Sequence, residues 1–170
     1  SLCNLPYSGN VEYSTHIQDI GWQSYRKNGS ISGTSGQSKR VEAIKIKLTG
    51  EISNYYDVYY RIHAQDLGWM SWTCNDSKAG TEGLELRVEA IQICLVEKGE
   101  NAPGDISRPF VEQGKVEYSS HVQNIGWQNY VNNGNTSGTV RQGLRLEALK
   151  IRLGDNSYEG NIEYSTHVQD

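Results

Sequence analysis

Histidine and glutamate, which can both move protons, recur at fixed places in a pattern that this 170-residue chain repeats three times. In each copy the histidine stands two residues before a glutamine, and the glutamate stands two residues after an arginine. The histidines are His16, His63 and His121, the glutamines are Gln18, Gln65 and Gln123, and the glutamates are Glu42, Glu89 and Glu147. Acid–base catalysis needs partners whose environments differ within one cleft. Three equivalent copies, without a nucleophile motif or a phosphate loop, favour a structural role for the glutamates and predict no enzymatic activity.

The histidine and glutamine of each His-x-Gln point to the same side of a strand, because residues two apart share a face. One interpretation is a polar ridge that offers hydrogen-bond donors and acceptors to a ligand. The other is that both side chains cap backbone groups of the following turn, and repetition of the whole element favours this second interpretation. Three converging histidines could hold zinc, but no cysteine or second histidine stands at ligand spacing within a repeat. We therefore predict neither a metal nor another cofactor.

Aromatic side chains follow each His-x-Gln in the pattern Gly-Trp-x-x-(Tyr or Trp). The first of each pair is Trp22, Trp69 or Trp127, and the second is Tyr25, Trp72 or Tyr130. An aromatic ring can pack on the C–H face of a sugar, or it can bury ~150–250 Å² in a core that lacks other large apolar residues. We expect the three Gly-Trp tryptophans to lie in the core, together with the repeated glutamates. The second aromatic residue is the better candidate for binding a ligand.

Two strands per repeat must position these residues. Residues 11–18 alternate between apolar and polar side chains, which is typical of a half-buried strand. Residues 40–48 form a stronger strand, in which the apolar residues from Ile44 onward face one way and the lysines between them face the other. The alternation slips near Ala43, which predicts a β-bulge. Nothing in the chain has the pattern of a long amphipathic helix.

The internal period defines the organisation of the chain. The tryptophans Trp22 and Trp69 are 47 residues apart, whereas Trp127 follows 58 residues later because of an inserted loop at residues 97–110. The predicted repeats span about residues 10–53, 54–100 and 112–158 of a single domain, and a partial fourth repeat spans residues 159–170. A β unit of this size cannot bury its own apolar face. We expect an all-β fold whose three repeats close with pseudo-threefold symmetry, as in a β-prism or a β-trefoil; the alternative is an open β-solenoid.

Composition excludes several classes of partner. The net charge is −4, and no block of like charge forms an electrostatic footprint for nucleic acid. No apolar run is long enough to insert into and span a membrane.

Cys74 and Cys94 replace surface-type residues of the other repeats, which favours a disulfide across neighbouring strands; two free thiols are the alternative. Cys3 has no assigned role.

These blocks resemble the clostridial hydrophobic repeat with tryptophan, the ChW repeat family, in three full copies and the start of a fourth. The shared pattern is Tyr-x-x-His-x-Gln-(Asp/Asn)-x-Gly-Trp, then a turn with Ser-Gly-Thr, then Arg-x-Glu-Ala-(Ile/Leu)-(Lys/Gln)-Ile. The Ser-Gly-Thr copies begin at Ser32 and Ser137. The resemblance implies a secreted or cell-surface bacterial protein, often with other extracellular modules, and it implies no settled biochemical activity.

We expect a non-catalytic extracellular binding module that recognises glycan, such as cell-wall, mucin or plant polysaccharide, through several weak sites. The sites would lie in the turns after each tryptophan, at residues 25–34, 72–80 and 130–139. The alternative is a protein-interaction, adhesion or structural array that displays an appended enzyme. In both cases the partner is a glycan or a cell-surface protein, and the sequence leaves the oligomeric state open.

Overall fold

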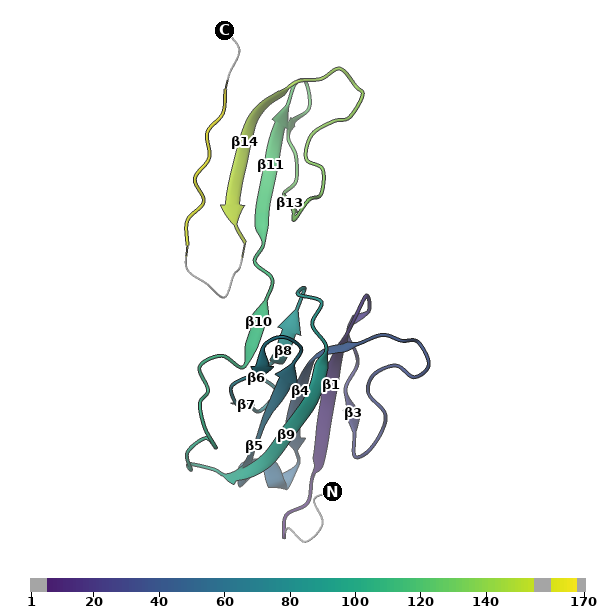
Figure 1. Ribbon diagram of the computed structural model, residues 1–170, viewed down its shortest axis with the longest axis vertical. Helices are drawn as coiled ribbons and strands as arrows, with labels where there is room; N and C mark the ends of the chain where they lie inside the picture. The colour runs from purple at the N-terminus through teal and green to yellow at the C-terminus, as the bar shows by residue number, and fades with distance from the viewer. Residues whose placement is uncertain (1–5, 155–159, 168–170) are drawn as a thin grey trace. The chain divides into compact units, whose positions relative to one another are not determined.

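The computed structural model describes residues 6–154 and 160–167, and the regular secondary structure within them is β-strand apart from one 3₁₀ helix at Glu51–Asn54. The all-β fold class is therefore confirmed. The chain divides into two compact units, residues 1–112 and residues 113–170. Repeats one and two form the first unit, and repeat three belongs to the second (Figure 1). In the part of the chain that is described, no helix is both long and apolar enough to cross a membrane.

Every repeat is built as the same small sheet. A long first strand pairs antiparallel with a long last strand, and two two-residue strands pair with the other edge of the first strand. Repeat one contains β1 (Asn10–Ile17), β2 (Gly21–Trp22), β3 (Arg26–Lys27) and β4 (Val41–Thr49). Repeat two contains β5 (Tyr56–Ala64), β6 (Gly68–Trp69), β7 (Thr73–Cys74) and β9 (Val88–Glu97). Repeat three contains β11 (Val116–Val122), β12 (Gly126–Trp127), β13 (Val131–Asn132) and β14 (Leu146–Leu153). The first unit also contains β8 (Ala79–Glu82) and β10 (Phe110–Glu112).

The alternating pattern of the last strand is confirmed in β4. Ile46 and Leu48 are buried, whereas Lys45 and Lys47 between them are half-exposed. Branched apolar residues favour this pleated geometry because their side chains pack on the neighbouring strand. The strand predicted at residues 11–18 corresponds to β1.

A β-bulge interrupts the long strand pair at the same place in every repeat. His16 pairs with Ala43, but the next residue, Ile17, pairs with Val41, so Glu42 is an extra residue in β4. The same register shift follows the histidine of repeat two and the histidine of repeat three. The predicted bulge near Ala43 is therefore confirmed, and it occurs at the glutamate of each Arg-x-Glu-Ala.

Repeats one and two share a single core in the first unit. Strand β8 of repeat two pairs antiparallel with β4 of repeat one, and β10 pairs with β8 in parallel (Figure 1). The buried apolar cluster contains Ile46, Leu48, Ile52, Val58, Tyr60, Ile62, Ala64, Met70, Ala79 and Val111. These residues come from both repeats and from β10, as expected if a single repeat cannot bury its own apolar face.

Gly80 allows β8 to lie against β4. Its φ angle is +123°, and a Cβ atom at this position would lie 2.4 Å from the carbonyl oxygen of Glu42 and 2.7 Å from the Cα of Ala43. Both neighbours are backbone atoms of a paired strand, which cannot turn aside as a flexible side chain would. Glycine meets the two requirements at once, because it has no Cβ and tolerates positive φ.

The second unit contains the sheet of repeat three. Its buried residues among those described are Ser119, Ser120 and Val122, all on β11, whereas Leu146 on β14 is 51% exposed. Of the predicted fourth repeat, residues 160–167 are described and contain no strand. The rest of that repeat, and Cys3, lie outside the described residues.

The strands form three separate sheets, and within the described residues no sheet closes into a barrel. One sheet has the order β10-β8-β4-β1-β2, with β3 also on β1. The second contains β6, β5 and β7 with β9 on β5, and the third contains β12, β11 and β13 with β14 on β11.

The predicted disulfide between Cys74 and Cys94 is wrong, because both thiols are free. Tyr59 of β5 pairs with Cys74 on one side and with Cys94 on the other. The two cysteine strands therefore flank β5 and are not neighbours. Adjacent strands lie about 4.8 Å apart, so cysteines on the two sides of a strand are beyond the roughly 7 Å Cα separation that a disulfide can bridge.

Candidate binding surface

An Arg–Glu–His chain of contacts is present in every repeat. The bulge directs the carboxylate of Glu42 toward β1, where it lies 3.1 Å from Nδ1 of His16 and accepts a hydrogen bond from Nε of Arg40 at 2.8 Å. In repeat two the same contacts are 3.2 Å from Glu89 to His63 and 2.7 Å from Glu89 to Arg87. In repeat three they are 3.2 Å from Glu147 to His121 and 3.3 Å from Glu147 to Arg145. In each of the three repeats, a carboxylate held by an arginine orients the histidine ring.

Each histidine ring in turn meets the tryptophan of its own repeat edge to face. The ring centroids are 5.4 Å apart for His16 and Trp22, and the other two repeats give 5.5 Å and 5.4 Å. The pairing of β1 with β2 places these two residues opposite each other. The repeated glutamate thus positions the tryptophan through the histidine.

The three Gly-Trp tryptophans do not form the predicted core. Trp69 is 42% exposed and Trp127 is 44% exposed, and only Trp22 is half-buried. Likewise Glu42 is buried, but the side chains of Glu89 and Glu147 are each 35% exposed. The core prediction is wrong for repeats two and three, where these tryptophans and glutamates are exposed or partly exposed; in the first unit the apolar core is built from Tyr60 and the strand aliphatics instead.

Trp22 is half-buried because part of repeat two covers it. Its indole Nε1 donates a hydrogen bond of 3.4 Å to Glu82, and Glu82 also lies 3.8 Å from Nε2 of His16. Lys78 forms a 3.0 Å ion pair with the same carboxylate. Burial alone would raise the pKa of Glu82, but Lys78, Trp22 and His16 together hold that pKa below its ordinary value.

The second aromatic residue of each repeat lies beneath a cation, and it is exposed in repeats one and three but half-buried in repeat two, where it is Trp72. Tyr25 is 38% exposed with the ammonium of Lys47 3.9 Å from its ring centroid, and Tyr130 is 41% exposed with the guanidinium of Arg152 at 4.2 Å. In repeat two the guanidinium of Arg61 lies 4.9 Å from the ring of Trp72. Contacts of this kind fix the ring on one side while part of it stays in water.

Tyr25 has a further partner in repeat two. Its hydroxyl donates a hydrogen bond to Asp76. Burial, together with the hydrogen bond to this carboxylate and its negative charge, raises the pKa of Tyr25 to about 12. The hydroxyl is therefore a donor throughout the neutral pH range.

The glutamines of His-x-Gln act mainly through the backbone. The N–H of Gln18 donates to the carbonyl of Arg40, and the equivalent bonds join Gln65 to Arg87 and Gln123 to Arg145 at the same 3.0 Å. Only Gln65 also uses its side chain in a described bond, as it accepts from Nη1 of Arg87 at 3.1 Å. No described hydrogen bond joins the side chain of Gln18, Gln65 or Gln123 to a backbone group of the following turn, so these contacts confirm neither the turn-capping interpretation nor the polar ridge.

Two glutamines that the sequence analysis passed over have a clearer role. Gln23 and Gln128, each directly after a Gly-Trp tryptophan, accept hydrogen bonds from the backbone N–H of Gly33 and Gly138 at 2.7 Å and 2.6 Å. Repeat two has Met70 at this place, and there the N–H of Gly80 donates to Pro109 instead. In the sequence, this role could have been recognised from the glutamine that directly follows the tryptophan in repeats one and three and is replaced by methionine in repeat two.

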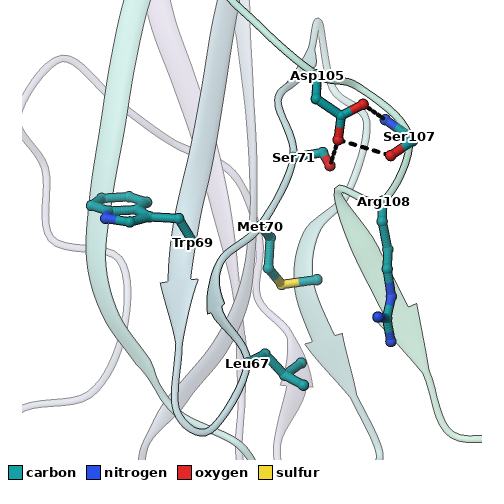
Figure 2. A pocket seen from close by; sticks show the side chains of 7 residues that line it. All are labelled: Leu67, Trp69, Met70, Ser71, Asp105, Ser107 and Arg108. Carbon is teal, nitrogen blue, oxygen red and sulfur yellow. Dashed lines mark hydrogen bonds between the residues drawn. The ribbon is translucent and has the colours of Figure 1, made fainter.

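A small hollow of about 200 Å³ lies beside Trp69 (Figure 2). Seven residues line it: Leu67, Trp69, Met70, Ser71, Asp105, Ser107 and Arg108. Asp105 accepts hydrogen bonds from Ser71 and Ser107, which hold the pKa of this carboxyl below its ordinary value. Figure 2 shows Trp69 pointing away from this hydrogen-bonded group. The hollow is smaller than the ~300 Å³ typical of ligand pockets.

The hollow exists because the inserted loop folds back on repeat two. The N–H groups of Ser71 and Trp72 donate to the carbonyls of Arg108 and Asp105, at 3.2 Å and 2.7 Å. The predicted surface loop is thus anchored along the turn that follows Trp69, and it leads directly into β10. Among the described residues no group of three His, Cys, Asp or Glu side chains is arranged to hold a metal ion.

The fold and these contacts define a tandem β-repeat protein whose repeats share one hydrogen-bonded His–Glu–Arg support for a tryptophan. A family model described as "Clostridial hydrophobic W" matches residues 16–50, 63–97 and 121–155, together more than half of the chain. The chain belongs to this family, ChW, and contains three copies of its repeat; such repeats are known in bacterial proteins. No curated protein and no solved structure matches the chain.

Proposed function

We propose that the chain is a non-catalytic, extracellular binding module that recognises glycan through its repeated aromatic surface. The observation that supports this best is the aromatic–cation pair of each repeat, whose ring is exposed in repeats one and three and half-buried in repeat two. The pairs are Tyr25 with Lys47, Trp72 with Arg61, and Tyr130 with Arg152. A secreted or cell-surface location is part of the same proposal.

The chemistry around these rings suits a sugar. Carboxylates stand beside the cations, since Glu12 lies 3.8 Å from Lys47 and Glu117 accepts a hydrogen bond of 2.7 Å from Arg152. A sugar ring can place its C–H face on the aromatic side chain while its hydroxyls bond to such donors and acceptors. A hollow of about 290 Å³ lies beside Tyr25. The repetition of the ring suggests that affinity would come from several sites that act on one polymer.

A glycan array followed by titration calorimetry tests this proposal. We expect binding to a polysaccharide that weakens when Tyr130→Ala removes one ring. Tyr164→Ala is the matched control, because Tyr164 is also an exposed tyrosine and, among the described contacts, no cation lies over its ring. The absence of any response to a broad panel of saccharides overturns the proposal.

The second candidate is a protein-interaction, adhesion or structural array that displays an appended enzyme. It is favoured by one observation, the pairing of β8 with β4, in which one repeat binds the strand edge of another. Closure of three repeats with pseudo-threefold symmetry belongs to this proposal, since a joint repeated between successive repeats can form a ring. Association between repeats without any saccharide binding would favour this candidate over the first.

A further inference from the structure

The hollow beside Tyr25 lies next to a short strand that is basic in repeat one alone. Five residues line this hollow of about 290 Å³: Glu12, Tyr25, Arg26, Lys27 and Ser30. Strand β3 of repeat one is Arg26-Lys27, whereas the equivalent strands are Thr73-Cys74 in repeat two and Val131-Asn132 in repeat three. Both cationic side chains of β3 are exposed. The repeats therefore share an aromatic ring at this place but differ in the charge beside it.

The register of β1 with its neighbours gathers side chains of both charges on one face of the sheet. Glu12 of β1 is opposite Lys27 of β3 on one side and opposite Lys47 of β4 on the other. Residues directly opposite each other in paired strands share a face. Tyr25 belongs to the same face, because the ammonium of Lys47 lies 3.9 Å from its ring centroid. One surface thus carries the ring together with cations from two strands.

The positive charge on this surface exceeds the negative charge. The ammonium of Lys47 lies 3.8 Å from Glu12 and 3.9 Å from Asp76 of repeat two. Among the described residues, no hydrogen bond or ion pair engages the side chain of Arg26 or Lys27. Three cations therefore face two carboxylates around Tyr25, and two of the three cations are free to bind a ligand.

Repeat three has the same ring without this excess of positive charge. The guanidinium of Arg152 lies 4.2 Å from the ring centroid of Tyr130 and donates a hydrogen bond of 2.7 Å to Glu117. Asn132 is opposite Glu117, where repeat one has Lys27 opposite Glu12, and its side chain is uncharged. The surface of repeat three is thus a balanced ion pair beside a tyrosine, and it serves as a reference for repeat one.

From these features we infer that the hollow of repeat one binds the anionic group, a carboxylate or a sulfate, of an acidic sugar residue. The inference rests on the proposed function and adds the class of sugar to it. The sugar ring packs on Tyr25, and its anionic group accepts hydrogen bonds from Arg26 and Lys27. The sugar hydroxyls bond to Glu12 and to the hydroxyl of Ser30.

The charge of the whole chain makes this local group of cations necessary for binding an acidic polymer. The net charge is −4, so long-range attraction does not bring a polyanion to the protein. Exposed charges are also screened beyond about 10 Å at ordinary ionic strength. Binding of an acidic polymer therefore reports close contacts with the cations of one site, and not the field of the whole molecule.

Titration calorimetry with paired polysaccharides tests the inference on the whole chain. Polygalacturonate is compared with its methyl ester, which keeps the sugar ring and removes the charge, and dextran sulfate is compared with dextran. We expect at least one acidic polymer to bind about tenfold more tightly than its uncharged counterpart, which corresponds to about 1.4 kcal/mol. The pair that shows the preference identifies the anionic group. Equal binding of acidic and uncharged polymers overturns the inference and leaves the proposed function standing, whereas no binding to any saccharide overturns both.

A single substitution assigns the preference to the hollow of repeat one. Lys27→Gln removes one of its free cations, and we expect about threefold weaker binding to the acidic polymer, as for the loss of one exposed ion pair. Arg141→Gln is the matched control, because it removes the same charge at an exposed position of repeat three. Equal weakening by the two variants overturns the inference.

The converse substitution places the charge in the reference repeat. Asn132→Lys puts a lysine opposite Glu117, as Lys27 is opposite Glu12. We expect about threefold tighter binding to the acidic polymer and unchanged binding to its uncharged counterpart. An equal gain for both polymers, or no gain for either, contradicts recognition of the anionic group by the lysine of this strand.

Discussion

Strands β4 and β9 have nearly the same sequence around Arg-x-Glu-Ala, and their environments within the first unit differ because there another repeat covers β4 and not β9. Glu42 on β4 is buried and Trp22 beside it is half-buried, whereas Glu89 and Trp69 are partly open to water. Within each repeat the contacts are the same, from the bulge to the histidine edge on the tryptophan. Burial in this protein is thus decided by the neighbouring repeat and not by the motif.

This comparison separates the two roles that the tryptophan can have. Where a neighbour is present, Trp22 becomes part of a joint between repeats and donates to Glu82. Where none is described, Trp69 and Trp127 remain surface aromatics with a cation over the ring, Arg61 at 4.9 Å and Lys150 at 4.1 Å. The same side chain is half-buried in one copy and exposed in the other two.

The pairing of β8 with β4 is most sensitive to substitution at Gly80. We expect Gly80→Val to destabilise the first unit by about 4 kcal/mol, because strain at positive φ adds to a collision with the backbone of β4. Gly33→Val has similar strain but open space around it, so we expect about 1–2 kcal/mol. Hydrogen exchange of peptides from β4 under increasing urea measures both, with peptides from β14 as the internal reference. Equal losses of stability in the two variants would show that the pairing of β8 does not depend on its close approach to the backbone of β4.

Truncating the equivalent isoleucines compares the covered strand with the open one. Ile46→Ala removes a buried side chain from the shared core, and we expect a loss of about 3 kcal/mol. Ile93→Ala removes one that is 54% exposed, and we expect less than about 1 kcal/mol at a dilution where the chain is monomeric. Urea titrations of the two variants measure the difference in their free energies of unfolding. If Ile93→Ala costs as much as Ile46→Ala, then β9 is also covered in solution.

The glutamate at the bulge should matter more where it is buried. Glu42→Gln weakens contacts to both Arg40 and His16 at a buried site, so we expect a loss of about 2 kcal/mol. Glu147→Gln makes the same change where the side chain is 35% exposed, and we expect less than about 1 kcal/mol. Thermal unfolding of each variant against the parent chain is the measurement. A larger effect at Glu147 would contradict the role of the neighbouring repeat.

The sequence predicts what lies within a repeat and misses what lies between repeats. The strands, the bulge near Ala43 and the closeness of arginine and glutamate follow from alternation and from the face shared by residues two apart. The burial of Trp22 depends on Glu82, sixty residues away, and no local pattern contains that information. The disulfide failed for a different reason, within repeat two: the alignment of repeats shows that Cys74 and Cys94 are surface-type positions, but it does not show which strands are neighbours, and β5 separates them.

The smallest effect concerns pH and the Glu82 carboxylate that covers Trp22. The pKa of Glu82 is lowered in the folded chain from its ordinary value of 4.5, so the charged form is favoured by folding. The stabilisation is therefore complete at neutral pH and is lost as the pH falls below about 4.5, through the folded pKa.

Because the side chain is 29% exposed, we expect Glu82→Gln to cost less than about 1 kcal/mol at pH 7. Urea titrations between pH 7 and about 3 should show the free energies of unfolding of the parent and of Glu82→Gln converging in acid, and Glu85→Gln, at an exposed position just after β8, is the control. A constant gap across this range would mean that Glu82 covers Trp22 through its shape and hydrogen bonds, and not through its charge.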